Sequence, residues 1–245
     1  MLQRSAIIAA SCLVLIAPRA SAQATDTIPP PSVLKQLSVE ELMDIEVTSV
    51  SRKAEKLSET ASAIQVITRE EIRRSGASNI PEALRLAPNL QVAEVGAHQW
   101  AITARGFNST TANKLLVLID GRSVYTPLFS GVFWDLQDVL LEDVDRIEVI
   151  SGPGGAVWGA NAVNGVINII TKSAKDTQGA YAEAGGGNSL EDFASARYGG
   201  AAGAHTNFRV YGKYSDRGND VTSTGDDVND TWRTGQGGVR FDAQT

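Results

Sequence analysis

Hydrophobic and polar residues alternate along four segments in the last third of the chain. These segments cover about residues 178–186, 191–200, 206–215 and 231–242. In the third segment Val210 falls on one face, whereas Arg209 and Lys213 fall on the other. A period of two predicts β-strands, because successive side chains point to opposite faces. The lengths of the connections alternate, which favours an antiparallel arrangement; a soluble β-meander remains an alternative.

Residues 61–172 show a different pattern, in which short helices are mixed with apolar strands. The run "SAIQVIT" at 62–68 predicts a strand. Thr68 and Glu71 have the spacing of a capping box, which predicts a helix that starts there. Gly76 is placed to end this helix, since glycine readily adopts the left-handed conformation.

Further signals of the same kind follow along this region. Asn79 and Glu82 predict a second capping box and another short helix. Two apolar runs flank Asp120-Gly121, which predicts a hairpin with a two-residue type I′ turn. Another strand is expected over Val144–Ile150. Together these elements predict a compact α+β unit.

A glycine-rich bend, "SGPGGAVWGANAVNG", occupies residues 151–165. Gly152 and Gly154 match two glycines of a dinucleotide-binding fingerprint, but Val157 stands where the third is needed. Gly154 and Gly159 have the spacing of a P-loop, but no lysine follows to reach a phosphate. The bend is therefore interpreted as a tight turn between strands, where glycine allows backbones to approach closely.

The first 22 residues have the pattern of an export signal. Arg4 gives a positive start, residues 6–17 are apolar, and Ala20-Ser21-Ala22 fits a cleavage site. The apolar stretch is too short for a membrane-spanning helix, which needs about 20 residues. A lipoprotein signal that ends at Cys12 is the alternative, although Cys12 comes early in the apolar run.

Composition excludes several kinds of chemistry. The formal net charge is −6, which argues against nucleic acid as a partner. Cys12 is the only cysteine and would leave with the signal, so disulfides and cysteine nucleophiles are not expected. His98 and His205 are the only histidines and lack ligand spacing, and Asp226–Asp230 lacks EF-hand spacing. We therefore expect no metal centre, no cofactor and no enzymatic activity.

The order of these parts resembles a TonB-dependent outer-membrane receptor, over nearly all of residues 44–215. In that family an Arg-x-Glu-Val strand leads to Gly-Pro, then an aromatic-Gly pair, then Gly-x-Ile-Asn-Ile-Ile-Thr-Lys. The matching residues here are Arg146, Glu148, Gly152, Pro153, Trp158, Gly159, Gly165, Asn168 and Lys172. The segments "ITARGF" and "LVLIDGRSV" are similar to two further parts of the family's plug.

The resemblance implies an α+β plug domain, with a small mixed sheet and short helices, followed by the first antiparallel strands of a transmembrane β-barrel. The expected divisions are a signal peptide at 1–22, a periplasmic linker at 23–50, the plug at 51–172 and barrel strands at 178–245. The expected location is the outer membrane, with the plug facing the periplasm.

The linker is expected to contain the coupling peptide called the TonB box. The candidate comprises Ile45, Glu46, Val47, Thr48, Ser49 and Val50. Its β-branched residues suit β-augmentation, in which an extended peptide joins the edge of a partner's sheet. Thr25–Ile28 is a weaker candidate, and a first plug strand is the structural alternative for the segment at 45–50.

The resemblance also implies energised uptake of an extracellular ligand, most often a ferric siderophore or another metal chelate. TonB and its inner-membrane motor ExbB/ExbD, outer-membrane lipid and this ligand are the expected partners. Plug residues expected to meet the ligand are His98, Trp100, Tyr125, Phe129 and Trp134, for which packing against the barrel wall is the alternative. Arg105, Arg146 and Glu148 are expected to contact the barrel, although a solvated strand face is also possible for the last two.

A complete barrel of this kind needs about 22 strands, and only four are predicted here. Four strands cannot close, so we expect a fragment or truncated product that does not transport by itself. Two other classes remain open. One is a periplasmic interaction or signalling module built on a plug, and the other is a secreted carbohydrate-binding β-protein.

Overall fold

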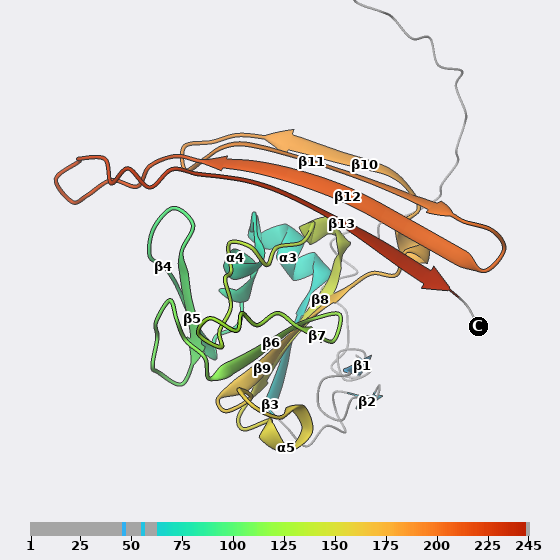
Figure 1. The fold of residues 1–245 in the computed structure, drawn as a ribbon, viewed down its shortest axis with the longest axis horizontal. Helices are drawn as coiled ribbons and strands as arrows, with labels where there is room; N and C mark the ends of the chain where they lie inside the picture. Colours follow the sequence, from blue (N-terminus) through green and yellow to red (C-terminus); the bar gives the residue numbers. More distant parts are fainter. Residues whose placement is uncertain (1–45, 48–54, 57–62, 244–245) are drawn as a thin grey trace, which may run out of the picture. The chain divides into compact units, whose positions relative to one another are not determined.

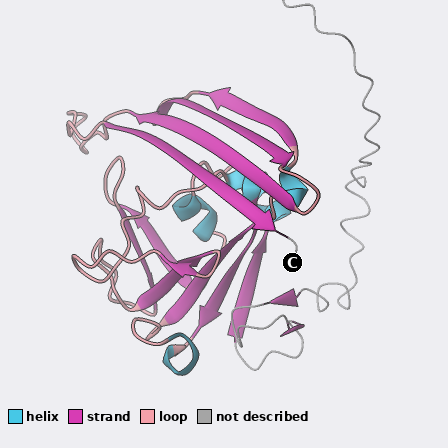
Figure 2. Cartoon of the chain, turned by 45° about the vertical axis from the view of Figure 1, so that its right-hand side comes forward, coloured by secondary structure: helices cyan, strands magenta, loops and turns pink. Residues whose placement is uncertain are grey.

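The computed structural model describes residues 46–47, 55–56 and 63–243. The predicted signal peptide, most of the linker and four residues of the TonB-box candidate lie outside the described residues. The described chain contains a five-stranded sheet, a four-stranded sheet and two short strand pairs. Figures 1 and 2 show that its helices are short and that strands dominate.

The five-stranded sheet is mixed, as the resemblance implies. Its order is β3-β8-β9-β6-β7, with β6 and β9 parallel and the other neighbours antiparallel. The strands are β3 (Ala63–Thr68), β6 (Leu115–Ile119), β7 (Arg122–Ser123), β8 (Val144–Ser151) and β9 (Gly165–Thr171). We call it the central sheet.

Both predicted helices form, and the first is capped as expected. Helix α3 (Arg69–Ser75) has a reciprocal capping box between Thr68 and Glu71, and it ends at Gly76 with φ of 71°. Helix α4 (Ile80–Leu84) begins with Asn79, whose side chain accepts a hydrogen bond from the amide of Glu82. The Glu82 carboxylate accepts instead from Ser78, so the second box is not reciprocal.

One face of the central sheet packs against these helices to form the main core. Ile67, Ile147 and Ile167 of the sheet are at most 1% exposed, as are Ile80 and Leu84 of α4. The strand pair β4 (Leu90–Glu94) and β5 (Trp100–Ala104) contributes to the same core. Shorter elements are η2 (Leu141–Asp143), α5 (Gly155–Trp158), η3 (Lys175–Thr177), β1 (Glu46–Val47) and β2 (Glu55–Lys56).

The two turns singled out in the sequence have the predicted character. Asp120 and Gly121 both have positive φ, of 48° and 76°, as a type I′ hairpin requires. In the glycine-rich bend, a Cβ on Gly165 would lie 2.4 Å from the carbonyl oxygen of Ile150. Glycine is therefore required there for β8 and β9 to approach, and α5 is a single short turn rather than a nucleotide-binding helix.

The four-stranded sheet consists of β10 (Gly179–Gly185), β11 (Leu190–Ala201), β12 (Thr206–Arg217) and β13 (Trp232–Ala243). Its strands are antiparallel and follow chain order, within a few residues of the four predicted segments. We call it the C-terminal sheet. Long strands of this sheet lie side by side in Figure 1.

The two faces of the C-terminal sheet differ in character. Val210, Val239 and Phe241 are 47%, 63% and 66% exposed on one face. Arg209 and Lys213, on the opposite face of β12, are mostly buried against residues that precede Lys172. Among the described residues, no helix has the length and apolar character needed to cross a bilayer.

Candidate functional site

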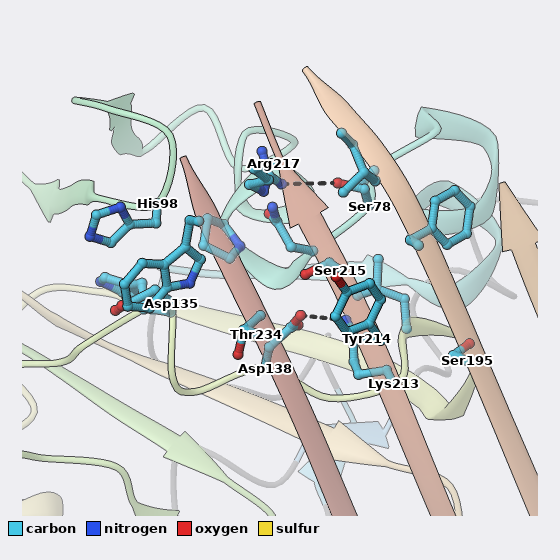
Figure 3. Close-up of a pocket in the computed structure, with 18 of the residues that line it drawn as sticks. Ser78, His98, Asp135, Asp138, Ser195, Lys213, Tyr214, Ser215, Arg217 and Thr234 are labelled. Atoms are coloured by element: carbon cyan, nitrogen blue, oxygen red, sulfur yellow. Dashed lines mark hydrogen bonds and ion pairs between the residues drawn. The ribbon is translucent and has the colours of Figure 1, made fainter. Parts of the chain in front are cut away.

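A cavity of about 340 Å³ lies between the C-terminal sheet and the domain that precedes it (Figure 3). Three of the five predicted ligand-facing residues line it, namely His98, Trp100 and Trp134. The C-terminal sheet contributes Lys213, Arg217 and Trp232, among others. We call this space the Trp232 cavity.

Aromatic rings form much of one side of this cavity. The rings of His98 and Trp232 are stacked, with centroids 4.1 Å apart and planes inclined by 11°. Trp100 and Trp134 are only 5% and 7% exposed and belong to the main core. Packing therefore accounts for most of the surface of these two indoles, and contact with a ligand remains a proposal for them.

The other two predicted ligand residues lie elsewhere. Tyr125 borders a separate cavity of about 810 Å³, together with Trp158 and Arg240. Burial raises the pKa of Tyr125 to about 12, so its hydroxyl stays protonated near neutral pH. The ring of Phe129 packs edge-on against Phe133, with centroids 5.0 Å apart. The structure thus brings three of the five residues together and leaves two apart.

Charged side chains also line the Trp232 cavity, and none of them was given a ligand-facing role from the sequence. Lys213 donates a hydrogen bond to Asp138, and Arg217 lies 3.4 Å from a carboxylate oxygen of Glu94 and 3.7 Å from one of Glu82. Figure 3 shows Lys213 directed toward Asp138, and Arg217 toward Ser78. Lys213 and Arg217 occupy inward positions of β12, and that alternation was the available signal.

A buried carboxylate at the end of η2, just before β8, contacts the C-terminal sheet. Asp143 is 2% exposed, and Arg197 of β11 donates a hydrogen bond to its Oδ1. The Nε atom of Arg209, on β12, lies 3.3 Å from Oδ2 of the same carboxylate. Arg209 also donates to the carbonyl oxygen of Lys172 at 3.0 Å. Two arginines of one sheet thus hold a single aspartate of the other domain.

A second polar cluster forms at the hairpin turn. Both carboxylate oxygens of Asp120 accept hydrogen bonds from Thr171, from its amide and from its hydroxyl, each at 2.8 Å. Arg240 of β13 donates to the same hydroxyl at 2.8 Å and lies 3.3 Å from Asp120. Asp242 accepts from the amide of Ala174 at 2.6 Å, which ties β13 to the segment between β9 and β10.

The residues predicted to contact a barrel make local interactions in the described part of the chain. Arg146 donates to Glu148 at 2.9 Å and to Asp145 at 2.7 Å. Glu148 is fully buried. The side chain of Arg105 approaches Gly152 of the glycine-rich bend. Contact of Arg105, Arg146 and Glu148 with a barrel wall stays a prediction.

The described part of the TonB-box candidate is a short strand. Glu46 and Val47 pair with Lys56 and Glu55 in an antiparallel bridge between β1 and β2. Val47 is 1% exposed. This pairing is what the first-plug-strand alternative describes, and the coupling role stays a prediction.

The loop between β12 and β13 is attached to the loop that carries His98. Asp230 accepts hydrogen bonds from the amides of Ala97 and Asp220, both at 2.9 Å. These two hydrogen bonds lower the pKa of Asp230, with His98 adding a smaller electrostatic effect. The residue lies in the acidic stretch Asp226–Asp230, which lacks the spacing of an EF-hand.

The site offers recognition by stacking, hydrogen bonding and charge. In the described residues, no group of three or more His, Cys, Asp or Glu side chains is arranged to hold a metal ion. The α+β domain before Lys172 is held by polar contacts to one face of the antiparallel C-terminal sheet, the face that carries Arg197, Arg209 and Lys213.

Comparison with known proteins agrees with this geometry. Residues 56–166 match the family model of the TonB-dependent receptor plug domain. The chain is 32% identical over 150 residues to the vitamin B12 transporter BtuB of Vibrio vulnificus (strain CMCP6). That alignment covers 60% of this chain and 24% of the relative. The chain thus spans about a quarter of the length of the curated relatives that it matches.

Solved structures share the fold. The ferric yersiniabactin uptake receptor FyuA from Yersinia pestis superposes with a TM-score of 0.55 and 18% identity, covering 80% of this chain and 30% of that one. The ferripyoverdine receptor of the outer membrane of Pseudomonas aeruginosa gives a TM-score of 0.57 and 22% identity, covering 71% and 23%.

The mixed plug sheet followed by antiparallel strands is the architecture that this chain shares with these solved receptors. Residues 56–166 therefore belong to the plug domain family of TonB-dependent receptors, which the sequence motifs had also indicated.

Proposed function

We propose that this chain forms the plug and first wall strands of an outer-membrane receptor that takes up a scarce ligand with energy delivered by TonB. The observation that carries the proposal is the asymmetry of the C-terminal sheet. Its inner face offers Arg197, Arg209 and Lys213 to the plug, and its outer face exposes Val239 and Phe241. Outward apolar and inward polar positions are what a barrel wall in lipid requires.

Coupling to TonB would act through the segment at 45–50. A peptide that already pairs as a short strand, as Glu46–Val47 does with β2, has the extended backbone needed for β-augmentation. On this proposal, ligand binding releases the segment, and TonB, driven by ExbB/ExbD, takes it up in place of β2.

The ligand class we propose is a metal chelate, with a ferric siderophore or other iron complex as the first candidate. Stacked rings such as His98 and Trp232 suit an amphipathic ligand, and nearby charges suit its polar groups. A corrinoid is the second candidate, favoured by the 32% identity to a vitamin B12 transporter.

Uptake by cells provides the test. The receptor that contains this chain would be expressed in an outer-membrane receptor deletion strain, with and without TonB. Growth would be scored on ferric siderophores as sole iron source and on cyanocobalamin as sole corrinoid. TonB-dependent rescue by one class supports the proposal and names the ligand. Rescue without TonB would contradict energised uptake, and a receptor present in the membrane that rescues growth on neither ligand class would favour the signalling alternative.

A further inference from the structure

One irregular segment of the plug crosses the inner face of three wall strands. Residues 135–143 contain no strand and end in the short helix η2. Gln236 of β13 donates to the carbonyl oxygen of Leu136 at 3.1 Å, and Lys213 of β12 donates to Asp138. At the far end, Asp143 is held by two arginines from β11 and β12. We call residues 135–143 the strap.

The strand register places these anchors close together on the sheet. Gln236 is the direct partner of Lys213, and Lys213 is the direct partner of Ser195. Arg197 lies two residues after Ser195 on β11, on the same face of the sheet, and its direct partner on β12 is Tyr211. The strap therefore follows neighbouring cross-strand rows and makes polar contacts with each of the three strands it crosses.

Cavities lie on both sides of the strap. Asp138 and Leu141 line the Trp232 cavity, which is also bordered by Lys213 and residues nearer the β12–β13 loop. Val139, Leu140 and Asp143 line another cavity of about 410 Å³, bordered by Arg209 and Arg240. We call the latter the Arg240 cavity. Along β12 and β13 the two cavities follow one another, and the strap lies between them.

The strap is held differently from the rest of the plug. The central sheet is fixed by an apolar core that includes Ile147, Val149 and Ile167, each fully buried. The strap contacts the wall mainly through charged and amide groups, which water or a polar ligand can replace. Displacing the strap would expose Leu140, which is 1% exposed, and would remove Val139 and Leu141 from the edge of the main core. Displacing the central sheet would expose the whole core, at a much larger cost in buried apolar surface.

We propose that the strap is the barrier on the route of the ligand, and that its local displacement joins the Trp232 and Arg240 cavities into a passage along the inner face of β11–β13. This inference rests on the proposed transport function. It assigns the opening to one segment anchored by Asp138 and Asp143, while the central sheet stays in place.

Passive leakage tests the barrier without any need for the ligand or for TonB. The variant Asp138→Asn/Asp143→Asn, in the receptor that contains this chain, removes both anchoring charges. It would be compared with Glu82→Gln/Glu94→Gln, which removes two plug carboxylates that face Arg217 away from the strap. Entry of a glycopeptide antibiotic too large for porins would be measured in cells that lack TonB.

We expect the strap variant to raise sensitivity about tenfold or more, because loss of a buried partner shifts a local equilibrium by at least that factor. The control variant should stay as tight as the unmodified receptor. Equal leakage in both variants, or no leakage from a strap variant present in the membrane in normal amount, would overturn the proposal.

A second variant covers the case in which the first fails to assemble. Arg197→Gln/Lys213→Gln breaks the same two anchors from the wall side. It should leak as the plug-side variant does, and a tight receptor would again contradict the barrier role. Because leakage is scored without TonB, a receptor that fails the uptake test can still confirm or refute the strap.

Discussion

Asp143 of the plug and Arg197 of the wall form a buried charged pair that no feature of their neighbouring sequences announces. Their side chains are 2% and 10% exposed, and Arg209 completes the pair into a cluster. Burying a carboxylate is costly unless it is paired, and Arg197 and Arg209 supply charged partners at short distance. The packing of the plug against the C-terminal sheet should therefore depend strongly on Asp143.

Asp143→Asn should destabilise the folded receptor by about 3 kcal/mol, since it leaves two arginines without their buried counter-charge. Asp145→Asn is the matched control, because Asp145 is 48% exposed and pairs only at the surface with Arg146. Its cost should be at most about 1 kcal/mol. Thermal denaturation followed by circular dichroism would rank the two, and equal melting temperatures would refute a structural role for the Asp143 cluster.

Gly165→Ala should weaken the plug, because the new methyl group would meet the carbonyl oxygen of Ile150 at 2.4 Å. Forcing β8 and β9 apart should cost about 1–3 kcal/mol, as overpacking generally does. Gly155→Ala, in the same bend, has open space around its Cβ and should be neutral or slightly stabilising. If both variants melt alike, the bend does not depend on close strand approach.

Glu142 should make plug stability depend on acidity. Burial alone would raise its pKa, but the hydrogen bond from Arg69 and the charges of Lys172 and Arg69 leave that pKa below its ordinary value of 4.5. A lowered pKa in the folded state adds stability above the unfolded value, and this stability is lost as the pH falls through the folded pKa.

Melting temperatures of the receptor and of Glu142→Gln, compared between about pH 7 and pH 3, would test this linkage. The unmodified receptor should lose more stability on acidification than the variant does. Parallel losses would show that Glu142 does not contribute.

Val47→Pro should abolish uptake and leave ligand binding intact, because proline removes the amide that a partner strand would use. Val47 also pairs with Glu55, so loss of that pairing must be separated from loss of coupling. Glu55→Pro breaks the same short pair outside the candidate box and should preserve uptake. Uptake that survives Val47→Pro would discard residues 45–50 as the TonB box.

Much of the fold could be predicted because local signals agreed with the final packing. The alternation around Val210 and Arg209 predicted both the strand and the side chains on each of its faces. A shift of one residue would exchange the two faces, so only one register places the apolar side chains on a single face. Thr68, Glu71 and Gly76 marked α3 through capping, and Asp120-Gly121 marked the hairpin through its positive φ values.

The rest depends on long-range contacts that local patterns do not encode. The strap has neither helical nor strand periodicity, so nothing in its sequence indicated that Asp138 and Asp143 meet wall residues more than 50 positions away. Arg146 bonds to Glu148 on its own strand, and the predicted contact of these two residues with a barrel stays a prediction. Of the aromatic candidates, Tyr125 lines a different cavity from His98, and no local pattern distinguishes the two.

The central claim is that residues after Lys172 form a wall whose outer side meets lipid and whose inner side meets the plug. Single cysteines at Val239 and Arg240, labelled with a fluorophore in the receptor that contains this chain, would be placed in bilayers with brominated lipid. The account predicts strong quenching at position 239 and little at 240, because neighbouring side chains point to opposite faces. Equal quenching at both positions, or none at either, would contradict it.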